Sequence, residues 1–262
     1  MAGVAGAALS PSAILPAALV LAGSRGTPDP VAASEGLAHK ALVDVAGTPM
    51  LARVLRALRE AGIEHLAVAA DDPEVLSIAY AFSAIVVAPG AGPPASVAAG
   101  FDTLGAPLLV TTADHALLRP EWVRDFIADT PAEADVAVLL ARRDTVEAAL
   151  PGNRRTWLRF ADGAWSGCNL FLLRTSRAEA AIETWKAVEA ERKRPWRLAA
   201  RLGAGTLLSY LTGRLTLVEA VARLGRRAGI VAAAVAARDG LAAVDVDKPS
   251  DLAQVRAILR SL

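Results

Sequence analysis

Apolar residues follow two alternating periods over the first part of the chain. Short apolar runs recur at residues 17–21, 65–70, 84–88, 107–112 and 135–140. Runs of this length are typical of strands that are buried on both faces of a parallel sheet. The stretches between them carry apolar residues at helical spacing, over 49–61, 73–82, 96–104 and 121–128. Strands that alternate with helices predict an α/β fold with a doubly wound, mainly parallel sheet and right-handed crossovers.

The pattern changes after residue 140. Short strands are expected at 157–160 and 170–173, on either side of a turn at Asp162-Gly163. Residues 177–228 are almost entirely helical in pattern, strands are expected at 230–235 and 242–246, and a last helix at 251–260. No linker or low-complexity segment separates these parts. We therefore expect a single domain over residues 1–262, with an arginine-rich helical elaboration at about 177–228.

Composition and charge exclude several classes of protein. The chain has 262 residues, of which 54% are hydrophobic and 21% are charged, so it is neither disordered nor fibrous. A net charge of +1 gives no bulk electrostatic reason to bind nucleic acid. One cysteine and three widely spaced histidines argue against a disulfide framework, a cysteine-based zinc cluster and a histidine-rich metal site.

The first 23 residues are nearly all apolar, which leaves a secretory signal or a membrane anchor as an alternative. No lysine or arginine precedes this run, however, and Pro11 and Pro16 interrupt it. Other apolar stretches are too short or too broken to span about 30 Å of hydrocarbon. These features favour a cytoplasmic, soluble protein.

A glycine-rich loop follows the first predicted strand, with the sequence Leu21-Ala22-Gly23-Ser24-Arg25-Gly26-Thr27. Such a loop can bring backbone N–H groups close to phosphates. It lacks the Gly-Lys-Ser/Thr of a P-loop and the Gly-x-Gly-x-x-Gly of a dinucleotide site, so by itself it is explained equally well as an ordinary turn. Lys40 follows, in front of an apolar stretch that is expected to be a strand, and Gly47-Thr48-Pro49-Met50-Leu51 opens the next helix.

Two further segments add to this combination. Thr111-Thr112-Ala113-Asp114-His115 ends the fourth predicted strand, and Val244-Asp245-Val246-Asp247-Lys248-Pro249 precedes the last helix. With the glycine-rich loop and Lys40, they resemble the MobA-like NTP transferases over about residues 17–125 and 240–256. The resemblance implies a GT-A/Rossmann-like three-layer fold. It also implies a nucleotidyltransferase that binds an NTP and Mg²⁺, or Mn²⁺ in its place.

The resemblance also suggests a role for each candidate residue. The nucleotide-binding candidates are Leu21, Ala22, Gly23, Ser24, Arg25, Gly26, Lys40, Gly92, Ser96 and Asp114. The catalytic candidates are Arg25, Lys40 and Asp114, the metal candidates are Asp114, Asp245 and Asp247, and the acceptor-binding candidates are His115 and Asn169. Which of Asp245 and Asp247 is the second metal ligand stays open.

General chemistry agrees with these roles. In open α/β sheets, ligands bind outside the carboxyl ends of strands, where the loop, Asp114 and Asp247 are expected. Backbone amides with Arg25 and Lys40 would hold the β- and γ-phosphates, and two carboxylates would hold one Mg²⁺. The acceptor's own phosphate attacks, so no side-chain nucleophile is required. Cys168 is therefore expected to be a small buried thiol.

Structural roles remain alternatives for several residues. Asp114 could cap a turn, Lys40 could be a solvated loop residue, and Ser96 could be a plain helix cap. Asp251 is best explained by the first turn of the last helix. The basic segment Glu191–Arg197 fits either a solvated helix face or a surface for an anionic acceptor or a membrane.

The leading functional hypothesis is Mg²⁺-dependent transfer of a nucleotidyl group from an NTP to a phosphorylated sugar, polyol or lipid headgroup, with release of pyrophosphate. A GT-A glycosyltransferase that uses a sugar nucleotide is one alternative. Asp245-Val246-Asp247 matches the Asp-x-Asp of that class, although it lies near the C-terminus. A nucleotide-binding module without turnover is the other alternative.

Overall fold

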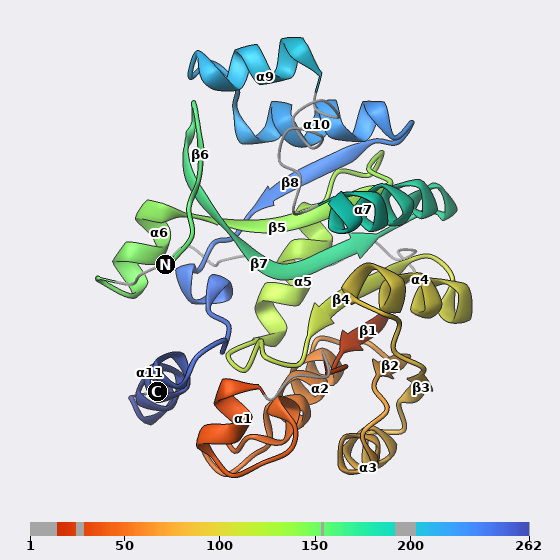
Figure 1. The fold of residues 1–262 in the computed structure, drawn as a ribbon, viewed down its shortest axis with the longest axis vertical. Helices are drawn as coiled ribbons and strands as arrows, with labels where there is room; N and C mark the ends of the chain where they lie inside the picture. Colours follow the sequence, from red (N-terminus) through yellow and green to blue (C-terminus); the bar gives the residue numbers. More distant parts are fainter. Residues whose placement is uncertain (1–14, 25–28, 153–154, 192–202, 262) are drawn as a thin grey trace, which may run out of the picture.

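The computed structural model describes residues 15–24, 29–152, 155–191 and 203–261, and the sheet has eight strands (Figure 1). The strands are β1 Ala17–Leu21, β2 Leu66–Ala69, β3 Ile85–Val87, β4 Leu108–Thr112, β5 Val136–Arg142, β6 Leu158–Phe160, β7 Gly163–Leu173 and β8 Ala232–Ala236. In space they follow the order β3-β2-β1-β4-β7-β5-β8, and β6 pairs with β7. The pairs β3·β2, β2·β1, β1·β4 and β5·β8 are parallel. The expected α/β fold with a mainly parallel sheet is confirmed.

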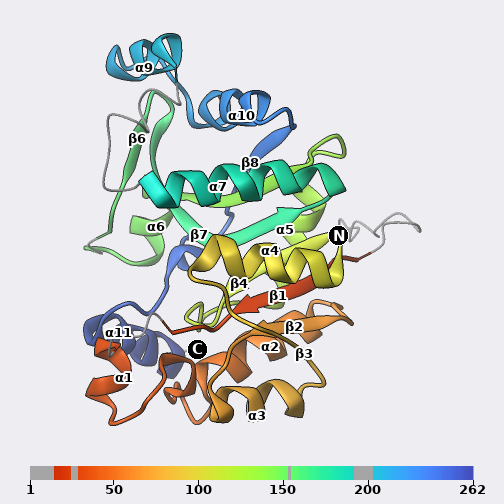
Figure 2. The same cartoon turned by 45° about the vertical axis from the view of Figure 1, so that its right-hand side comes forward.

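Helices cover both faces of the sheet. They are α1 Pro30–Ser34, α2 Met50–Glu60, α3 Pro73–Ala81, α4 Pro93–Leu104, α5 Pro120–Asp129, α6 Arg143–Ala149, α7 Glu179–Glu191, α9 Ala204–Leu211, α10 Leu217–Arg227 and α11 Pro249–Arg260. Short 3₁₀ turns are η1 Lys40–Leu42, η2 Ser176–Ala178 and η3 Gly240–Ala243. Helices α4 and α7 lie side by side on one face (Figure 2), whereas α2 and α5 pack on the other. The sheet is therefore the middle of three layers.

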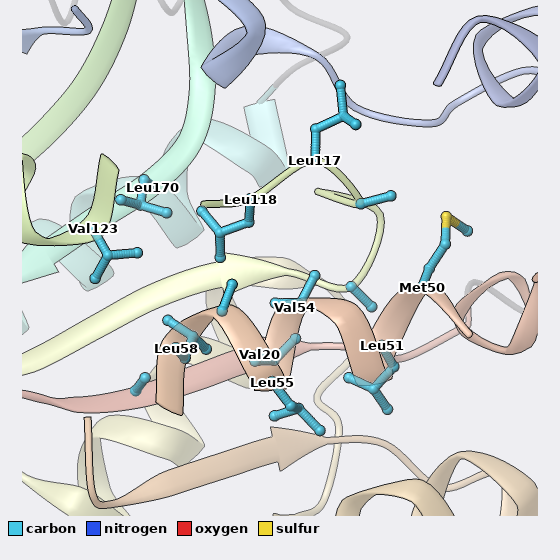
Figure 3. Close-up of a cluster of buried hydrophobic side chains, with 14 of the residues drawn as sticks. Val20, Met50, Leu51, Val54, Leu55, Leu58, Leu117, Leu118, Val123 and Leu170 are labelled. Carbon is cyan, nitrogen blue, oxygen red and sulfur yellow. The ribbon is translucent and has the colours of Figure 1, made fainter. Parts of the chain in front are cut away.

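Side chains of the central strand β1 alternate between the two faces, as the period of a strand requires. Ala18 and Val20 belong to the apolar cluster under α2, and Leu19 belongs to the cluster under α4. Gly100 of α4 sits directly on Leu19, because a Cβ at that position would overlap the leucine side chain. Figure 3 shows part of the cluster under α2, including Val20, Met50, Leu51, Val54, Leu55 and Leu58. These two clusters fix β1 and therefore the point at which the loop after it starts.

One central strand runs against the direction expected for a wholly parallel sheet. Strand β7 lies between β4 and β5 and is antiparallel to both. It spans 11 residues, of which the predicted strand at 170–173 is only the last part. It enters the sheet through the hairpin with β6, around the turn predicted at Asp162-Gly163. Apolar runs indicate burial but not strand direction, so the sequence pattern could not place this strand.

Several segments that lead to the site differ from their predicted local structure. The residues from Lys40 to Leu42 form the 3₁₀ turn η1 rather than a strand, and η3 occupies residues 240–243, where the sequence predicts a strand over 242–246. Short buried apolar segments cannot be assigned by periodicity alone, which explains both errors. Helices α1 and α6 are further additions to the prediction. Helix α1 begins because the Asp29 side chain accepts the backbone N–H groups of Val31 and Ala32.

The predicted helical elaboration contains α7, α9 and α10. Helix α10 packs on β8 and α9 lies beyond it, at the end of the sheet away from β3 (Figures 1 and 2). The basic segment Glu191–Arg197 lies outside the described residues except for Glu191, so its two interpretations stay open. No helix within the described ranges is long and apolar enough to cross a bilayer.

Candidate functional site

The predicted phosphate-binding loop begins beside the strand that carries Asp114. Strands β1 and β4 pair in parallel with Leu21 opposite Thr112, so their carboxyl ends are adjacent. Leu21 is half-buried and Ala22 is buried, whereas Gly23 and Ser24 are exposed. Arg25 and Gly26 lie outside the described residues. The described start of the loop therefore faces solvent next to the end of β4.

The second nucleotide-binding candidate is the turn Pro89–Ser96, at the carboxyl end of β3. The Ser96 hydroxyl accepts the backbone N–H of Gly90 at 2.9 Å, and the Ser96 N–H donates to the Gly92 carbonyl at 3.0 Å. Gly92 caps α4, and the buried Ser96 holds the turn against the start of that helix. A Cβ on Gly23 would come within 3.1 Å of Pro89 Cβ, so the turn and the loop after β1 lie against each other. The described start of the loop and the turn after β3 are thus direct neighbours.

Lys40 is at the centre of an acidic cluster that we call the cation cluster, with Asp114, Asp247 and Asp29. The Lys40 ammonium nitrogen lies 2.7 Å from Asp114 Oδ2, 3.5 Å from Asp247 Oδ1 and 3.9 Å from Asp29 Oδ2. The Thr112 hydroxyl donates to the other oxygen of Asp114. Burial opposes the charge of Lys40, but the carboxylates outweigh it and raise the pKa of the ammonium above its usual range. The lysine is therefore a permanently charged partner of these carboxylates.

The C-terminal segment is fixed against the end of β4. The Val246 N–H donates to the Asp114 carbonyl at 3.1 Å, which places Asp247 over the cation cluster. Asp251 accepts the backbone N–H groups of Asp247 at 3.1 Å and Lys248 at 2.9 Å. Asp251 thus occupies the first turn of α11, the role that its position predicts, and it also shapes the loop that carries Asp247.

The donor atoms of the cation cluster fit a hard divalent cation. Two carboxylates, from Asp114 and Asp247, already converge on one positive group, the Lys40 ammonium. Mg²⁺ is usually held by one or two carboxylates with the remaining oxygens from water and substrate phosphates. Within the described ranges, no group of three or more His, Cys, Asp or Glu side chains forms a ready-made metal site. Asp114 and Asp247 would therefore hold an ion together with a phosphate-bearing substrate.

A second network lies on the other side of β4, toward β7 and β5. The Asn169 side-chain amide donates to Asp245 Oδ2 at 3.0 Å, and Arg155 Nη2 donates to Asp245 Oδ1 at 2.6 Å. Both oxygens of Asp245 are engaged in this way, unlike those of Asp247, whose side chain is 62% exposed. Asp245 and Asp247 therefore have different partners and different exposure, a difference that the sequence alone does not predict.

His115 and Cys168 face the interior. His115 is 1% exposed and stacks on Trp122 with ring centroids 6.1 Å apart, and burial lowers its pKa to about 4. A ligand cannot reach a ring that is this buried, so its predicted contact with the acceptor gains no support from its position. Cys168 is buried, as expected, and burial raises the pKa of its thiol to about 12. A thiol with this pKa is a poor nucleophile near neutral pH.

Sequence reasoning did not single out Asp29 or Arg155. Asp29 lies in a proline-rich stretch with no motif, and its signal is the N-cap pattern Asp29-Pro30. Arg155 is one of many arginines and precedes β6 without any distinguishing spacing. Both residues reach the site only through the fold.

Comparison with known proteins gives a family match over most of the chain. Residues 18–194 match the MobA-like NTP transferase domain. A solved structure described as a hypothetical transferase, from Thermus thermophilus, is 33% identical, with a TM-score of 0.79 over 91% of this chain and 100% of that chain.

More distant structures share the fold. A CMP:2-keto-3-deoxy-manno-octonic acid synthetase complexed with CTP has 23% identity and a TM-score of 0.56, over 94% of this chain and 98% of that one. A nucleotidyl transferase from Methanothermobacter has 20% identity and a TM-score of 0.57, over the same shares of the two chains.

Curated relatives match over a shorter stretch. The 3-deoxy-manno-octulosonate cytidylyltransferase of Bradyrhizobium sp. (strain ORS 278) is 33% identical over 131 residues, which are 46% of this chain and 53% of that protein. The enzyme of the same name from Nitrobacter hamburgensis is 29% identical over 130 residues, 46% of this chain and 50% of that protein. The chain spans about half the length of the curated relatives it matches.

Proposed function

The chain belongs to the MobA-like NTP transferase domain family, and we propose that it is a Mg²⁺-dependent nucleotidyltransferase that acts on a phosphorylated small molecule. The acceptor class is a sugar, polyol or lipid-headgroup phosphate. The observation that carries the proposal is the convergence of Asp114 and Asp247 on the Lys40 ammonium, directly beside the loop that begins at Gly23. This is an arrangement that can receive a triphosphate and a cation together.

The order of the strands supports a site with two halves. The loop after β1 and the turn after β3 lie on one side of β4, and the network of Asn169, Asp245 and Arg155 lies on the side of β7. Asp114, at the end of β4, stands between them. A nucleotide over β1–β3 and an acceptor over β7 would therefore meet at Asp114, where the α-phosphate has to be attacked.

The reaction needs no nucleophile from the protein. An oxygen of the acceptor phosphate forms a new bond to the α-phosphorus, the bond from that phosphorus to the bridging oxygen breaks, and the electron pair leaves with pyrophosphate. Mg²⁺, held by Asp114 and Asp247, would supply neutralisation of phosphate charge. Lys40 would bind β- or γ-phosphate oxygens, because its ammonium is charged and close to these carboxylates. The backbone N–H groups of the loop would hold the same phosphates.

The structure gives less support to a GT-A glycosyltransferase. That class uses both carboxylates of an Asp-x-Asp pair around its metal and sugar nucleotide. Here Arg155 and Asn169 occupy the two oxygens of Asp245, and only Asp247 faces the cation cluster. Asp245-Val246-Asp247 therefore does not present two carboxylates to one ion.

Thermal unfolding with ATP, CTP, GTP and UTP, each with and without Mg²⁺, tests the proposal. CTP comes first, because the curated relatives are cytidylyltransferases. A ligand at about 100 times its Kd adds about 2.7 kcal/mol of stability, a shift of several degrees for a domain of this size. We expect a Mg²⁺-dependent shift with at least one NTP that is lost in Asp114→Asn and kept in Asp102→Asn, an exposed aspartate on α4.

The same experiment has outcomes that overturn the proposal. A shift with sugar nucleotides and none with any NTP would indicate the glycosyltransferase instead. An NTP shift without pyrophosphate release, across a panel of sugar and polyol phosphates, would indicate a binding module without turnover. A normal shift in Asp114→Asn would remove this residue from the metal site.

A further inference from the structure

The acceptor half of the site contains a largely buried ion pair that the proposed reaction does not itself require. The Arg155 side chain is 12% exposed and that of its partner Asp245 is 24% exposed. Arg155 Nη1 is buried and has no hydrogen-bond partner within the part of the chain that the structure describes. Buried pairs contribute little net stability, and an unsatisfied buried donor is costly. Stability alone therefore does not account for Arg155 at this position.

The third member of the network, Asn169, stands at an irregular point of β7. Val138 of β5 pairs with Phe171, whereas Leu140 pairs with Gly167, so β7 contains extra residues between these two pairs. Asn169 has a φ of 48°, in the left-handed region that asparagine adopts more readily than most residues. Bulges of this kind re-aim side chains next to active sites. Here the bulge brings the Asn169 amide to Asp245.

The partners of Asp245 keep it apart from the cation cluster. Among the described residues, Lys40 has ion pairs with Asp114, Asp247 and Asp29 but none with Asp245. Instead, the Arg155 guanidinium lies 2.6 Å from one oxygen of Asp245 and the Asn169 amide lies 3.0 Å from the other. These two partners hold a third carboxylate beside Asp114 and Asp247 without an ion pair to Lys40.

We propose that Arg155 is a positioning residue for nucleotidyl transfer. It fixes Asp245 on the acceptor side, and Asp245 in turn aims the Asn169 side chain at the acceptor. Asp245 then belongs to the acceptor pocket, and Asp247 is the second metal ligand. The inference rests on the proposed function, because it requires an acceptor in this half of the site. An amide held in this way recognises hydroxyl groups, which a sugar or polyol phosphate offers.

Metal binding separates the two aspartates. Mn²⁺ binding is measured by electron paramagnetic resonance, in the presence of the NTP that gives the largest thermal shift. We expect Asp247→Asn to weaken Mn²⁺ binding about tenfold or more and Asp245→Asn to change it less than about threefold. Both oxygens of Asp245 accept short hydrogen bonds, whereas the Asp247 carboxylate has, among the described residues, only the 3.5 Å contact with Lys40. Equal weakening by the two substitutions would overturn the inference.

Steady-state kinetics tests the role of Arg155, with the acceptor that the pyrophosphate-release panel identifies. We expect Arg155→Met and Asp245→Asn to raise the KM for the acceptor about tenfold or more and to leave the KM for the NTP within about twofold. Arg155→Lys, which keeps the charge, should recover part of the loss. Arg238→Met is the matched control, because Arg238 pairs with Asp125 and Asp129 on the surface.

A double variant covers the case in which Arg155→Met leaves a buried charge and fails to fold. Arg155→Met combined with Asp245→Asn removes both charges, and the acceptor KM should be no worse than for Asp245→Asn alone, because the two residues act as a unit. A normal acceptor KM together with normal NTP binding would overturn this inference and leave the proposed function intact. Absence of any NTP shift in the wild type would instead refute the proposed function.

Discussion

The turn after β3, in the proposed nucleotide half of the site, has room for only one residue type at Gly90. A Cβ at this position would lie 2.7 Å from the Ala95 carbonyl carbon and 2.9 Å from the Ser96 nitrogen. Both are backbone atoms at the start of α4, which cannot rotate away as a side chain would. Gly90→Ala therefore has to push the turn off the helix and break the bond from the Gly90 N–H to the Ser96 hydroxyl.

The expected loss of stability follows from these contacts. Overpacking costs about 1–3 kcal/mol, and the lost hydrogen bond adds about 0.5–1.5 kcal/mol. Each kcal/mol lowers the Tm of a domain of this size by about 2–4 °C, so the Tm should fall by roughly 3–18 °C. Because the displaced turn also lies against Gly23, the thermal shift produced by the NTP should shrink in the same variant.

Thermal unfolding with and without nucleotide measures both effects. The matched control is Gly205→Ala, since a Cβ on this exposed residue of α9 meets no atom within 4 Å. Alanine in a helix is better than glycine by about 0.5–1 kcal/mol, so the control should be neutral or slightly stabilising. A Gly90→Ala protein with the wild-type Tm and the wild-type nucleotide shift would refute the reasoning about the turn.

Three further predictions concern single side chains. Without nucleotide, Lys40→Met should bind Mn²⁺ about tenfold more tightly than wild type, because a charge-assisted contact of about 1.5–3 kcal/mol no longer competes for the carboxylates. Titration with Mn²⁺, followed by electron paramagnetic resonance, measures this affinity, with Lys186→Met as the control. An unchanged affinity would contradict the prediction. Burial raises the pKa of Cys168 to about 12, so its thiol should resist iodoacetamide in the native protein and react once the protein is unfolded. Mass spectrometry measures the labelling, and rapid labelling of the native protein would contradict the prediction. Burial lowers the pKa of His39 in the folded protein, so below about pH 6.5 the unfolded chain binds more protons than the folded one. The free energy of unfolding should therefore decrease as the pH is lowered through this range. His39→Asn, which retains an acceptor for the Ala41 N–H, should reduce the dependence of Tm on pH between about 7.5 and 5.5 and leave the part that the buried His115 contributes. An equally steep dependence would exclude His39 as a source of it.

The apolar pattern correctly predicted the elements that bury one face or both faces. The apolar run at 17–21 is β1 with the predicted bounds, and the amphipathic stretch at 49–61 is α2 to within a residue at each end. Such segments are determined by their own periodicity, because each must bury one face or both. Residues 41–42 and 240–243 are also apolar and largely covered, but they belong to 3₁₀ turns, since contacts from elsewhere in the fold cover them.

Part of the candidate site could also be predicted. Lys40, Asp114 and Asp247 were candidates from their motifs, and the fold brings them together from positions 74 and 207 residues apart. Arg155 and Asp29 could not be found in this way, because neither sits in a motif. The separation of Asp245 from Asp247 depends on Arg155 and Asn169, which are 90 and 76 residues away from Asp245 in the chain.

The sequence alone determined the family, the alternation of strands and helices, and the residue types that can hold phosphates and a cation. These depend on composition, period and short motifs, which are local properties of the chain. Only the tertiary structure decided that β7 enters antiparallel between β4 and β5, and which partner each aspartate has. Strand direction and long-range ion pairs depend on contacts between segments that are distant in the sequence. The local sequence pattern does not predict such contacts.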